Sequence, residues 1–393
     1  MDGLEEKPSL EEKKIDLDKE FEDLLEQDFF RFSLEKIKDL RLKFFKAAFE
    51  HHYNNCPEYY RYCKINGAKP EDIQEYQDLE KIQPVPADAF RDSDNLILSV
   101  PEKEIKEIFT TSSTTSPNPV RYAYNAKDYE MISKMNGPLW KDGYDIPNPV
   151  SMFFLAPSPQ ESDTGLVKGG YLGWKGVGFK DENFYFGVKD GKIDAEDIIE
   201  KIKNCEKPVT IYGPPFAYLP FMELWKNKGK QPLIDLSGKA RVITTGGWKG
   251  VKHDVSKEEL KEQIAQVFNI DSSEIRDGYG STDIMTMLPE CKYGKKHVPF
   301  WNHVSIRDSE DTNKELEPGK EGLVVLMASW PKAYPAFCMT GDMGYVREEE
   351  CECGRKGQTV EITGRAKGAG ARGCAIRLEQ FMDAIKKENA FDF

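Results

Sequence analysis

The sequence predicts an α/β protein in which helices flank β-sheets. From about Lys106 onward, short apolar runs of strand length alternate with segments of helical spacing, and turns that contain glycine or proline separate them. Strands that alternate with helices are typical of layered α/β folds. The length of 393 residues, with 39% apolar and 31% charged residues, suits a globular protein with a large core rather than a disordered chain.

The individual elements follow from the spacing of apolar side chains. Residues 33–63 repeat apolar and aromatic side chains at helical spacing. Helices are also predicted at Asp194–Lys203 and Lys257–Phe268. The polar segment Asp308–Glu321, with its Pro-Gly pair, is predicted to be a hairpin or loop. Four apolar runs have the length and composition of strands: Val150–Leu155, Val209–Tyr212, Ala240–Thr245 and Gly322–Ala328.

The composition argues against several classes of protein. The 68 Asp and Glu outnumber the 55 Lys and Arg, and the formal net charge of -13 gives no global attraction for nucleic acid or anionic lipid. No run reaches the roughly 18 to 20 apolar residues of a membrane span. The charged N-terminus does not fit a secretory signal. We expect a cytoplasmic protein with no nucleic-acid or membrane partner, whose eight cysteines are not a disulfide framework.

A hydroxyl-rich loop follows the strand-like residues Ile108 and Phe109. Every residue from Thr110 to Ser116 carries a hydroxyl group, so the loop offers hydroxyl and backbone N–H donors that can surround phosphate oxygens. The pattern differs from the G-x-x-x-x-G-K-[ST] phosphate loop. Segments rich in serine and threonine are more often ordinary loops. The residues alone therefore leave both interpretations open.

Four short segments further along the chain are ordinary turn motifs when each is taken alone. They are Thr245–Lys249, Asp277–Asp283, Thr340–Asp342 and Gly364–Arg365. Their type and order, after the loop Thr111–Ser116, resemble the nucleotide-binding segments of the adenylate-forming superfamily. Several motifs that match in order over most of a chain are much more specific than any one of them.

The resemblance implies a role for each segment. In the loop, with serine at the two glycine positions of the superfamily, the residues implied to surround ATP phosphates are Thr111, Ser112, Thr114 and Thr115. The other positions that it assigns to ATP and Mg²⁺ are Gly246, Gly247, Tyr279, Gly280, Thr282, Asp283, Asp342 and Arg365. Among these, Tyr279 would pack on adenine, Asp283 would help to hold Mg²⁺, and Asp342 would accept hydrogen bonds from the ribose hydroxyls. Arg365 would contact ribose or phosphate.

Three cysteines and one histidine form two short clusters, Cys291-x5-His297 and Cys351-x-Cys353. Three thiols and one imidazole are a complete tetrahedral set for Zn²⁺. The spacing is not that of a zinc finger, and ordinary loop cysteines are the alternative. The clusters resemble the zinc site of phenylacetate–CoA-ligase-like members of the superfamily, which implies a structural Zn²⁺ that holds two loops together.

The segment after Arg365 is too short for the C-terminal domain of full-length CoA ligases in this superfamily. In size and in this early end the chain resembles the LuxE-type acyl-protein synthetases, whose tail carries an acyl-accepting cysteine. The matching residue is Cys374, and Arg372 and Arg377 are expected to lower its pKa. The alternative for Cys374 is a packing residue in the last helix. Lys249 is the candidate to replace the missing catalytic lysine electrostatically, and the alternative for it is an ordinary solvated lysine.

The charge-rich residues 1–28 are expected to form a solvated helical arm. The resemblance implies the large N-terminal domain of an adenylate-forming enzyme over 29–365 and a short tail over 366–393. The implied reaction is ATP-dependent activation of a carboxylic acid, a fatty acid in that family, followed by transfer to a protein cysteine as a thioester. An acyl reductase is the implied partner. The alternatives are an aryl- or acyl-CoA ligase with another acceptor, and a non-catalytic nucleotide-binding protein.

The acid itself is expected to occupy an apolar pocket, because apolar and aromatic side chains line most small-molecule sites. The residues proposed for this pocket are Trp140, Tyr212, Pro214, Pro215, Phe216, Trp248 and Phe300. Such a pocket suits either a fatty or an aromatic acid.

Overall fold

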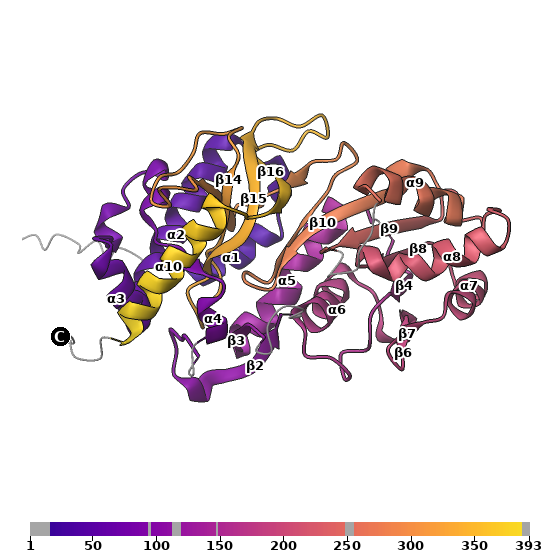
Figure 1. Cartoon of the computed structure of the whole chain (residues 1–393), viewed down its shortest axis with the longest axis horizontal. Coiled ribbons are helices and arrows are strands. Elements are labelled where there is room, and N and C mark those ends of the chain that lie inside the picture. The colour runs from indigo at the N-terminus through magenta and orange to yellow at the C-terminus, as the bar shows by residue number, and fades with distance from the viewer. Residues whose placement is uncertain (1–15, 93–95, 112–118, 147, 248–254, 387–393) are drawn as a thin grey trace, which may run out of the picture.

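Two six-stranded sheets lie beside each other along an elongated molecule, and each has helices packed on it (Figure 1). The structure is a computed structural model, and it describes residues 16–92, 96–111, 119–146, 148–247 and 255–386. Helices from both ends of the chain lie with the first sheet, while the middle of the chain forms the second. This arrangement confirms the predicted α/β fold.

The first sheet is antiparallel except for one short strand. Its order is β12-β16-β15-β14-β13, and β1 pairs with β15 in parallel. The strands are β1 (Val85–Pro86), β12 (Lys296–His297), β13 (Asn302–Arg307), β14 (Gly322–Ala328), β15 (Phe337–Glu348) and β16 (Gln358–Arg365). The polar segment 308–321 joins the antiparallel neighbours β13 and β14, so the predicted hairpin is confirmed.

The second sheet is parallel except at one edge. Its order is β11-β10-β9-β8-β4-β5, and β11 runs antiparallel to β10. The strands are β4 (Ser151–Phe154), β5 (Phe184–Phe186), β8 (Val209–Gly213), β9 (Ala240–Thr245), β10 (Ile275–Ser281) and β11 (Thr286–Pro289). All four predicted strands are confirmed, and β9 and β14 have the predicted bounds.

Helices cover both faces of the second sheet. They are α5 (Ala126–Gly143), α6 (Gly165–Val177), α7 (Ala195–Asn204), α8 (Leu219–Asn227) and α9 (Lys257–Phe268). Because side chains alternate along a strand, Phe154 packs in the core cluster that contains α5 and α6, while Phe153 packs in the cluster that contains α7, α8 and α9. Helix α9 begins with a capping box between Ser256 and Glu259. Helices α7 and α9 confirm the two predicted there.

The remaining helices lie with the first sheet. They are α1 (Leu17–Leu25), α2 (Leu34–Asn55), α3 (Pro57–Ile65), α4 (Ala89–Asp92) and α10 (Ala369–Lys386). Helices α2 and α3 confirm the helical pattern of residues 33–63. Helix α10 packs against α3, β1 and β15, which places the end of the chain beside its beginning (Figure 1). Two small antiparallel pairs complete the fold: β2 (Ile105–Thr110) with β3 (Arg121–Asn125), and β6 (Val188–Lys189) with β7 (Lys192–Ile193).

Helix α1 departs from the solvated arm expected for the N-terminal residues. Its side chains Phe21, Leu24 and Leu25 are buried, and the ring of Phe21 meets that of Phe44 edge-on at 5.3 Å between centroids. The charged residues of α1 occupy only one side of the helix, so its apolar side is free to pack on the body of the protein. The expectation was therefore right for the charged face and wrong for the apolar one.

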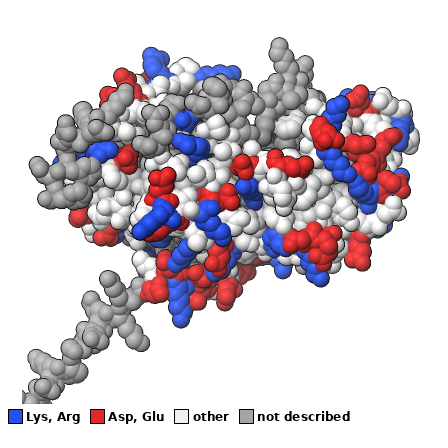
Figure 2. All heavy atoms as spheres, turned by 90° about the horizontal axis from the view of Figure 1, so that it is seen from below, with Lys and Arg blue, Asp and Glu red and all other residues white. Residues whose placement is uncertain are grey.

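The surface carries charges of both signs. On the face shown in Figure 2, lysine and arginine side chains lie among aspartates and glutamates. Within the described residues, none of the helices has the length and apolar character that a membrane crossing requires.

Candidate active site

A cavity of about 340 Å³ lies where the two sheets meet. On the side of the second sheet it is lined by Tyr212, Thr245 and Tyr279, which lie at or near the carboxyl ends of the parallel strands β8, β9 and β10. On the side of the first sheet it is lined by Asp342 and Arg365, among others. Ligands of open α/β sheets bind at the carboxyl ends of parallel strands, so the position is that of a binding site.

Sequence segments that are far apart in the chain come together at this cavity. The residues with a nucleotide role implied by the sequence that line it are Thr111, Gly246, Tyr279, Gly280, Thr282, Asp283, Asp342 and Arg365. Gly247 is described but does not line the cavity. The remaining candidates lie outside the described residues: Ser112, Thr114, Thr115 and Lys249.

Asp342 is held by two donors on opposite sides of the cavity. The Tyr279 hydroxyl donates to Asp342 Oδ2 at 2.7 Å, and Arg365 Nη1 donates to Asp342 Oδ1 at 2.9 Å. Burial and the Asp342 carboxylate raise the pKa of Tyr279 well above its ordinary value, so the phenol keeps its proton and remains a donor. The three residues join strands β10, β15 and β16 through one carboxylate.

Asp283 has a second, separate set of partners. Its carboxylate accepts hydrogen bonds from the hydroxyl of Tyr122 and, at 2.7 Å, from Ser281 Oγ. The Tyr334 hydroxyl donates to the Asp283 carbonyl oxygen at 2.9 Å. Burial raises the pKa of Asp283, while the bonds from Ser281 and Tyr122 act in the opposite direction. The role of Tyr122 was not predicted, because nothing in the alternation of β3 distinguishes it from a core residue.

The inner half of the cavity is largely apolar. Of the predicted pocket residues, Trp140 and Tyr212 line it. Phe300 does not, because it packs in the core, with its ring 5.7 Å from that of Phe21. The residues Pro214, Pro215 and Phe216 do not line the cavity, and Trp248 lies outside the described residues. Sequence reasoning missed the wall from α5, α6, β11 and the residue before β11: Asn136, Gly165, Leu166, Gly169, Gly170, Met285 and Met287.

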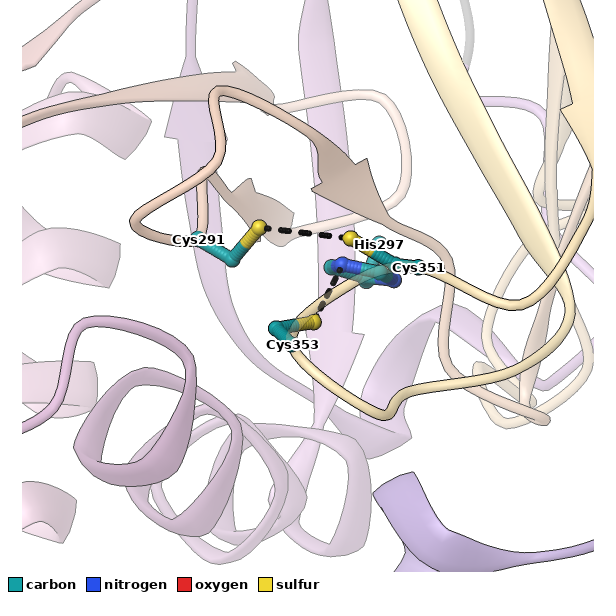
Figure 3. A group of neighbouring side chains, drawn as sticks. All are labelled: Cys291, His297, Cys351 and Cys353. Carbon is teal, nitrogen blue, oxygen red and sulfur yellow. Dashed lines mark hydrogen bonds between the residues drawn. The ribbon is translucent and has the colours of Figure 1, made fainter.

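The three cysteines and the histidine proposed as metal ligands meet at the edge between the sheets (Figure 3). Their ligand atoms all lie within 4.8 Å of one another. Cys291 Sγ is 3.9 Å from Cys351 Sγ, and Cys353 Sγ is 3.3 Å from His297 Nε2. Two segments some sixty residues apart are thereby brought into one cluster, and three soft thiol donors with one imidazole suit Zn²⁺.

The two cysteine turns share one backbone geometry. The N–H of Gly294 donates to the Cys291 carbonyl and the N–H of Gly354 donates to the Cys351 carbonyl, at 2.9 Å and 2.7 Å. Both glycines have positive φ, 73° and 82°, which a residue with a Cβ would adopt only with strain. Burial lowers the pKa of His297 to about 3, so its imidazole is neutral and able to act as a metal ligand. The repeated C-x-x-G spacing is a sequence signal that strengthens the metal interpretation.

We expect the variant Cys351→Ser to lower the zinc affinity of the protein by more than about 100-fold, because it removes one ligand outright rather than an outer-shell partner. The measurement is zinc content by elemental analysis after dialysis against a weak chelator. Cys205→Ser is the matched control, because Cys205 is a half-buried free cysteine outside the cluster. Equal zinc content in both variants, or none in the wild type, would contradict a zinc site.

Cys374 lies in the second turn of α10, near enough to Arg365 and Asp342 for their charges to act on the pKa of its thiol. A Cβ at Gly370, one turn earlier, would lie 3.3 Å from Met343 Sδ, so this part of α10 sits directly on the strand that carries Asp342. Burial raises the pKa of the Cys374 thiol to about 11, and the charge of Arg365 lowers it only in part. Cys374 does not itself line the cavity.

The expectation that Arg372 and Arg377 lower the thiol pKa is wrong. Arg372 is exposed. The buried Arg377 donates to the Tyr62 hydroxyl at 3.0 Å and to Gln83 Oε1 at 2.9 Å, and so anchors α10 to the first part of the chain. The arginine that acts on Cys374 comes from β16 instead, and burial of the thiol outweighs it.

Alkylation of Cys374 in the free protein is expected to speed up about tenfold per pH unit between pH 7 and 9, because only the thiolate reacts and the pKa of the thiol is raised to about 11. A short peptide with the same cysteine should instead level off near the ordinary pKa of about 8.5. The measurement is the rate of iodoacetamide labelling of the peptide that contains Cys374. A rate that levels off below pH 8 would show a lowered pKa and contradict the structure.

Comparisons with known proteins agree on one family. The sequence profile described as "Acyl-protein synthetase, LuxE" matches residues 9–127 and 193–383. Two relatives are named long-chain-fatty-acid–luciferin-component ligase. The Vibrio harveyi protein is 27% identical over 90% of this chain and 91% of its own. The Aliivibrio fischeri protein is 28% identical over 88% of this chain and 89% of its own.

Solved structures agree with the fold. Two structures of 2-hydroxyisobutyryl-CoA ligase, an open conformation and a thioesterification state, superimpose with TM-scores of 0.65 and 0.68 at 16% and 15% identity. They cover 84% and 85% of this chain, which covers 76% and 69% of theirs. The fold is therefore that of the adenylate-forming acyl-CoA ligases. Because the family profile matches most of its length, this chain belongs to the LuxE family of acyl-protein synthetases.

Proposed function

We propose that this protein uses ATP to convert a fatty acid into an acyl adenylate and then transfers the acyl group to its own Cys374 as a thioester. The observation that carries this proposal is the convergence of the nucleotide-binding candidates on one cavity, with the Cys374 thiol close enough to feel the charges of Arg365 and Asp342. The family membership and the ligase fold support the same reaction.

In the first half-reaction, the residues of the cavity bind and orient ATP. Asp342 accepts from the ribose hydroxyls in place of its present donors, and Arg365 is then free to contact ribose or phosphate. Thr111, the one residue of the hydroxyl-rich loop that lines the described cavity, offers its hydroxyl to the phosphates. One oxygen of the substrate carboxylate attacks the α-phosphorus, a P–O bond forms, and the bond to pyrophosphate breaks. Positioning and charge neutralisation supply most of the rate.

In the second half-reaction, the Cys374 thiolate attacks the carbonyl carbon of the acyl adenylate. A C–S bond forms, the C–O bond to AMP breaks, and the thiol proton passes to solvent. Helix α10 is anchored by Arg377 and by Phe381, which is fully buried, so the thiol has a fixed position next to the ribose-binding pair. Because the pKa of the thiol is raised, the thiol keeps its proton in the free protein and loses it only when it attacks the acyl adenylate.

Two metals belong to this proposal. Asp283 supplies a carboxylate at the cavity that suits Mg²⁺, an ion that neutralises phosphate charge when it is bound. Cys291, His297, Cys351 and Cys353 would hold Zn²⁺, and they supply the four protein ligands that a closed structural zinc site needs. Zinc there ties the loop after β11 to the turn between β15 and β16 and takes no part in the reaction.

The names of the two relatives identify a long-chain fatty acid and a luciferin component in their own systems. For this chain we propose a fatty acid as substrate, because the inner half of the cavity is apolar. We propose as partner a protein, such as an acyl reductase, that takes the acyl group from Cys374.

The test is acid-dependent ATP–pyrophosphate exchange with a panel of straight-chain and aromatic acids. We expect exchange with straight-chain fatty acids, and none without acid. Exchange that leads to an acyl-CoA thioester when free CoA is added would favour a CoA ligase. A complete lack of exchange with every acid would contradict the proposal and leave a nucleotide-binding protein.

A further inference from the structure

The inner end of the cavity is closed by Trp140 of α5. Helix α6 lines the cavity with Gly165, Gly169 and Gly170 on its first turns. Three side chains pack on successive turns of this helix face, because a Cβ at Gly165, Gly169 or Gly173 would collide with Thr282, Met285 or Trp140 in turn. Trp140 is 3% exposed and is itself a lining residue. Trp140 is the last of these three side chains along α6, so an alkyl chain that passes Thr282 and Met285 meets its ring.

Trp140 is fixed in that place. Its Nε1–H donates to the Met287 carbonyl oxygen at 3.2 Å, which ties the ring to strand β11. Its ring centroid lies 4.8 Å from that of Trp174, which is fully buried and in turn lies 5.2 Å from Tyr212. Aromatic rings therefore fill the space directly behind Trp140.

Beyond Trp140, helices α5 and α6 are in backbone contact. A Cβ at Gly137 would collide with the Gly176 backbone, and a Cβ at Gly176 would collide with the Ser133 carbonyl. Two helices this close leave no space for an alkyl chain to pass between them. The cavity is therefore blind at this end, and Trp140 defines its depth.

The segment that builds this end is also the one that the family profile leaves unmatched. The profile matches 9–127 and 193–383, so 128–192 lies between the two matched parts. This interval contains Trp140 and the whole of α6. The family profile therefore does not extend to this wall, whereas the alignments with the two relatives, which cover 90% and 88% of the chain, span part of it.

We propose that Trp140 is the residue that sets chain length, and that it restricts the enzyme to straight-chain acids shorter than the long-chain acids named for the relatives. This inference rests on the proposed function, since it concerns the acid that is adenylated. The cavity volume of about 340 Å³ supports it, because that is near the low end of the range for ligand sites and must hold both nucleotide and acyl group.

The experiment is ATP–pyrophosphate exchange with butanoic, octanoic, dodecanoic and tetradecanoic acids. For the wild type we expect kcat/KM to peak at octanoic acid or below and to fall by more than about tenfold at tetradecanoic acid, because overlong chains meet a closed wall. In Trp140→Leu, which shortens the wall, kcat/KM for dodecanoic acid should rise by about tenfold or more. Trp140→Phe should shift the profile in the same direction by less.

Trp225→Leu is the matched control, because Trp225 of α8 is equally buried but belongs to the core cluster on the opposite face of the sheet. It should leave the chain-length profile unchanged. If Trp140→Leu does not fold, Trp140→Phe and the wild-type profile carry the test. Wild-type exchange that is equally fast with tetradecanoic and octanoic acids would overturn this inference and leave the proposed function intact. An unshifted profile in a folded Trp140 variant would also overturn it, and no exchange with any acid would overturn both.

Discussion

Replacement of Cys374 by serine is expected to abolish the covalent acylation of the protein while acid-dependent pyrophosphate exchange continues within about twofold of the wild-type rate. The first half-reaction uses the cavity, which Cys374 does not line, so its removal leaves adenylation intact. The second needs a thiolate at position 374, and a serine hydroxyl without an adjacent base is a poor nucleophile. The measurement is intact protein mass after incubation with ATP, Mg²⁺ and the best acid.

The matched control for this variant is again Cys205→Ser, which should keep both the acyl adduct and the exchange. An acyl adduct that persists in Cys374→Ser would move the acceptor to another residue. Loss of exchange together with the adduct would mean that Cys374 acts in adenylation or in folding, contrary to its position outside the cavity.

The variant Asp342→Asn is expected to raise the KM for ATP by about 10- to 100-fold, the range that follows from losing a hydrogen bond to a charged group worth roughly 1.5 to 3 kcal/mol. The two carboxylate oxygens of Asp342 accept one hydrogen bond each, from Tyr279 and from Arg365. An asparagine side chain has one acceptor oxygen in place of two, so it cannot accept both bonds in this way. The measurement is the initial rate of pyrophosphate exchange as ATP is varied.

Tyr279→Phe separates the two interactions at this site, because it removes only the hydroxyl that donates to Asp342 and keeps the ring that lines the cavity. We expect its KM for ATP to rise by less than about tenfold, as for the loss of one hydrogen bond. An unchanged KM in Asp342→Asn would remove Asp342 from nucleotide binding.

Much of the fold could be predicted from the sequence, because each central strand and helix has a strong local pattern. The run at β14 is apolar throughout, the run at β9 is rich in β-branched residues, and glycine or polar residues bound both, so even their ends were predicted. The two faces of α1 were harder. Its charged residues dominate the composition, and the buried positions of Phe21 and Leu24 follow from helical geometry only once a partner surface exists.

The cavity could be predicted in part. The nucleotide-binding candidates lie in short motifs at the ends of strands, where local sequence is informative. The apolar wall depends instead on how α5 crosses α6, and that crossing is set by close contacts between glycines such as Gly137 and Gly176. Such contacts join residues some forty positions apart, and a single sequence does not pair them.

The surroundings of Cys374 could not be predicted from the sequence either. Arg372 is exposed on another side of α10, and Arg377, one turn after Cys374, donates its hydrogen bonds to Tyr62 and Gln83 instead. Arg365 acts on the thiol because the chain turns back between β16 and α10, where the N–H of Ala366 donates to the Gly341 carbonyl at 2.9 Å. Burial in the fold, and after it the charges that lie near in space, set the pKa of this thiol, and the neighbours in sequence do not.

Peptide mapping of the wild-type protein after one turnover tests the central claim most directly. The protein is incubated with ATP, Mg²⁺ and the best acid, digested at low pH, and searched for the acyl mass. The structure predicts that the acyl group is on the peptide that contains Cys374 and that neutral hydroxylamine removes it, as expected for a thioester. A protein that shows acid-dependent exchange but carries no acyl group on that peptide would contradict the claim that Cys374 accepts the acyl group.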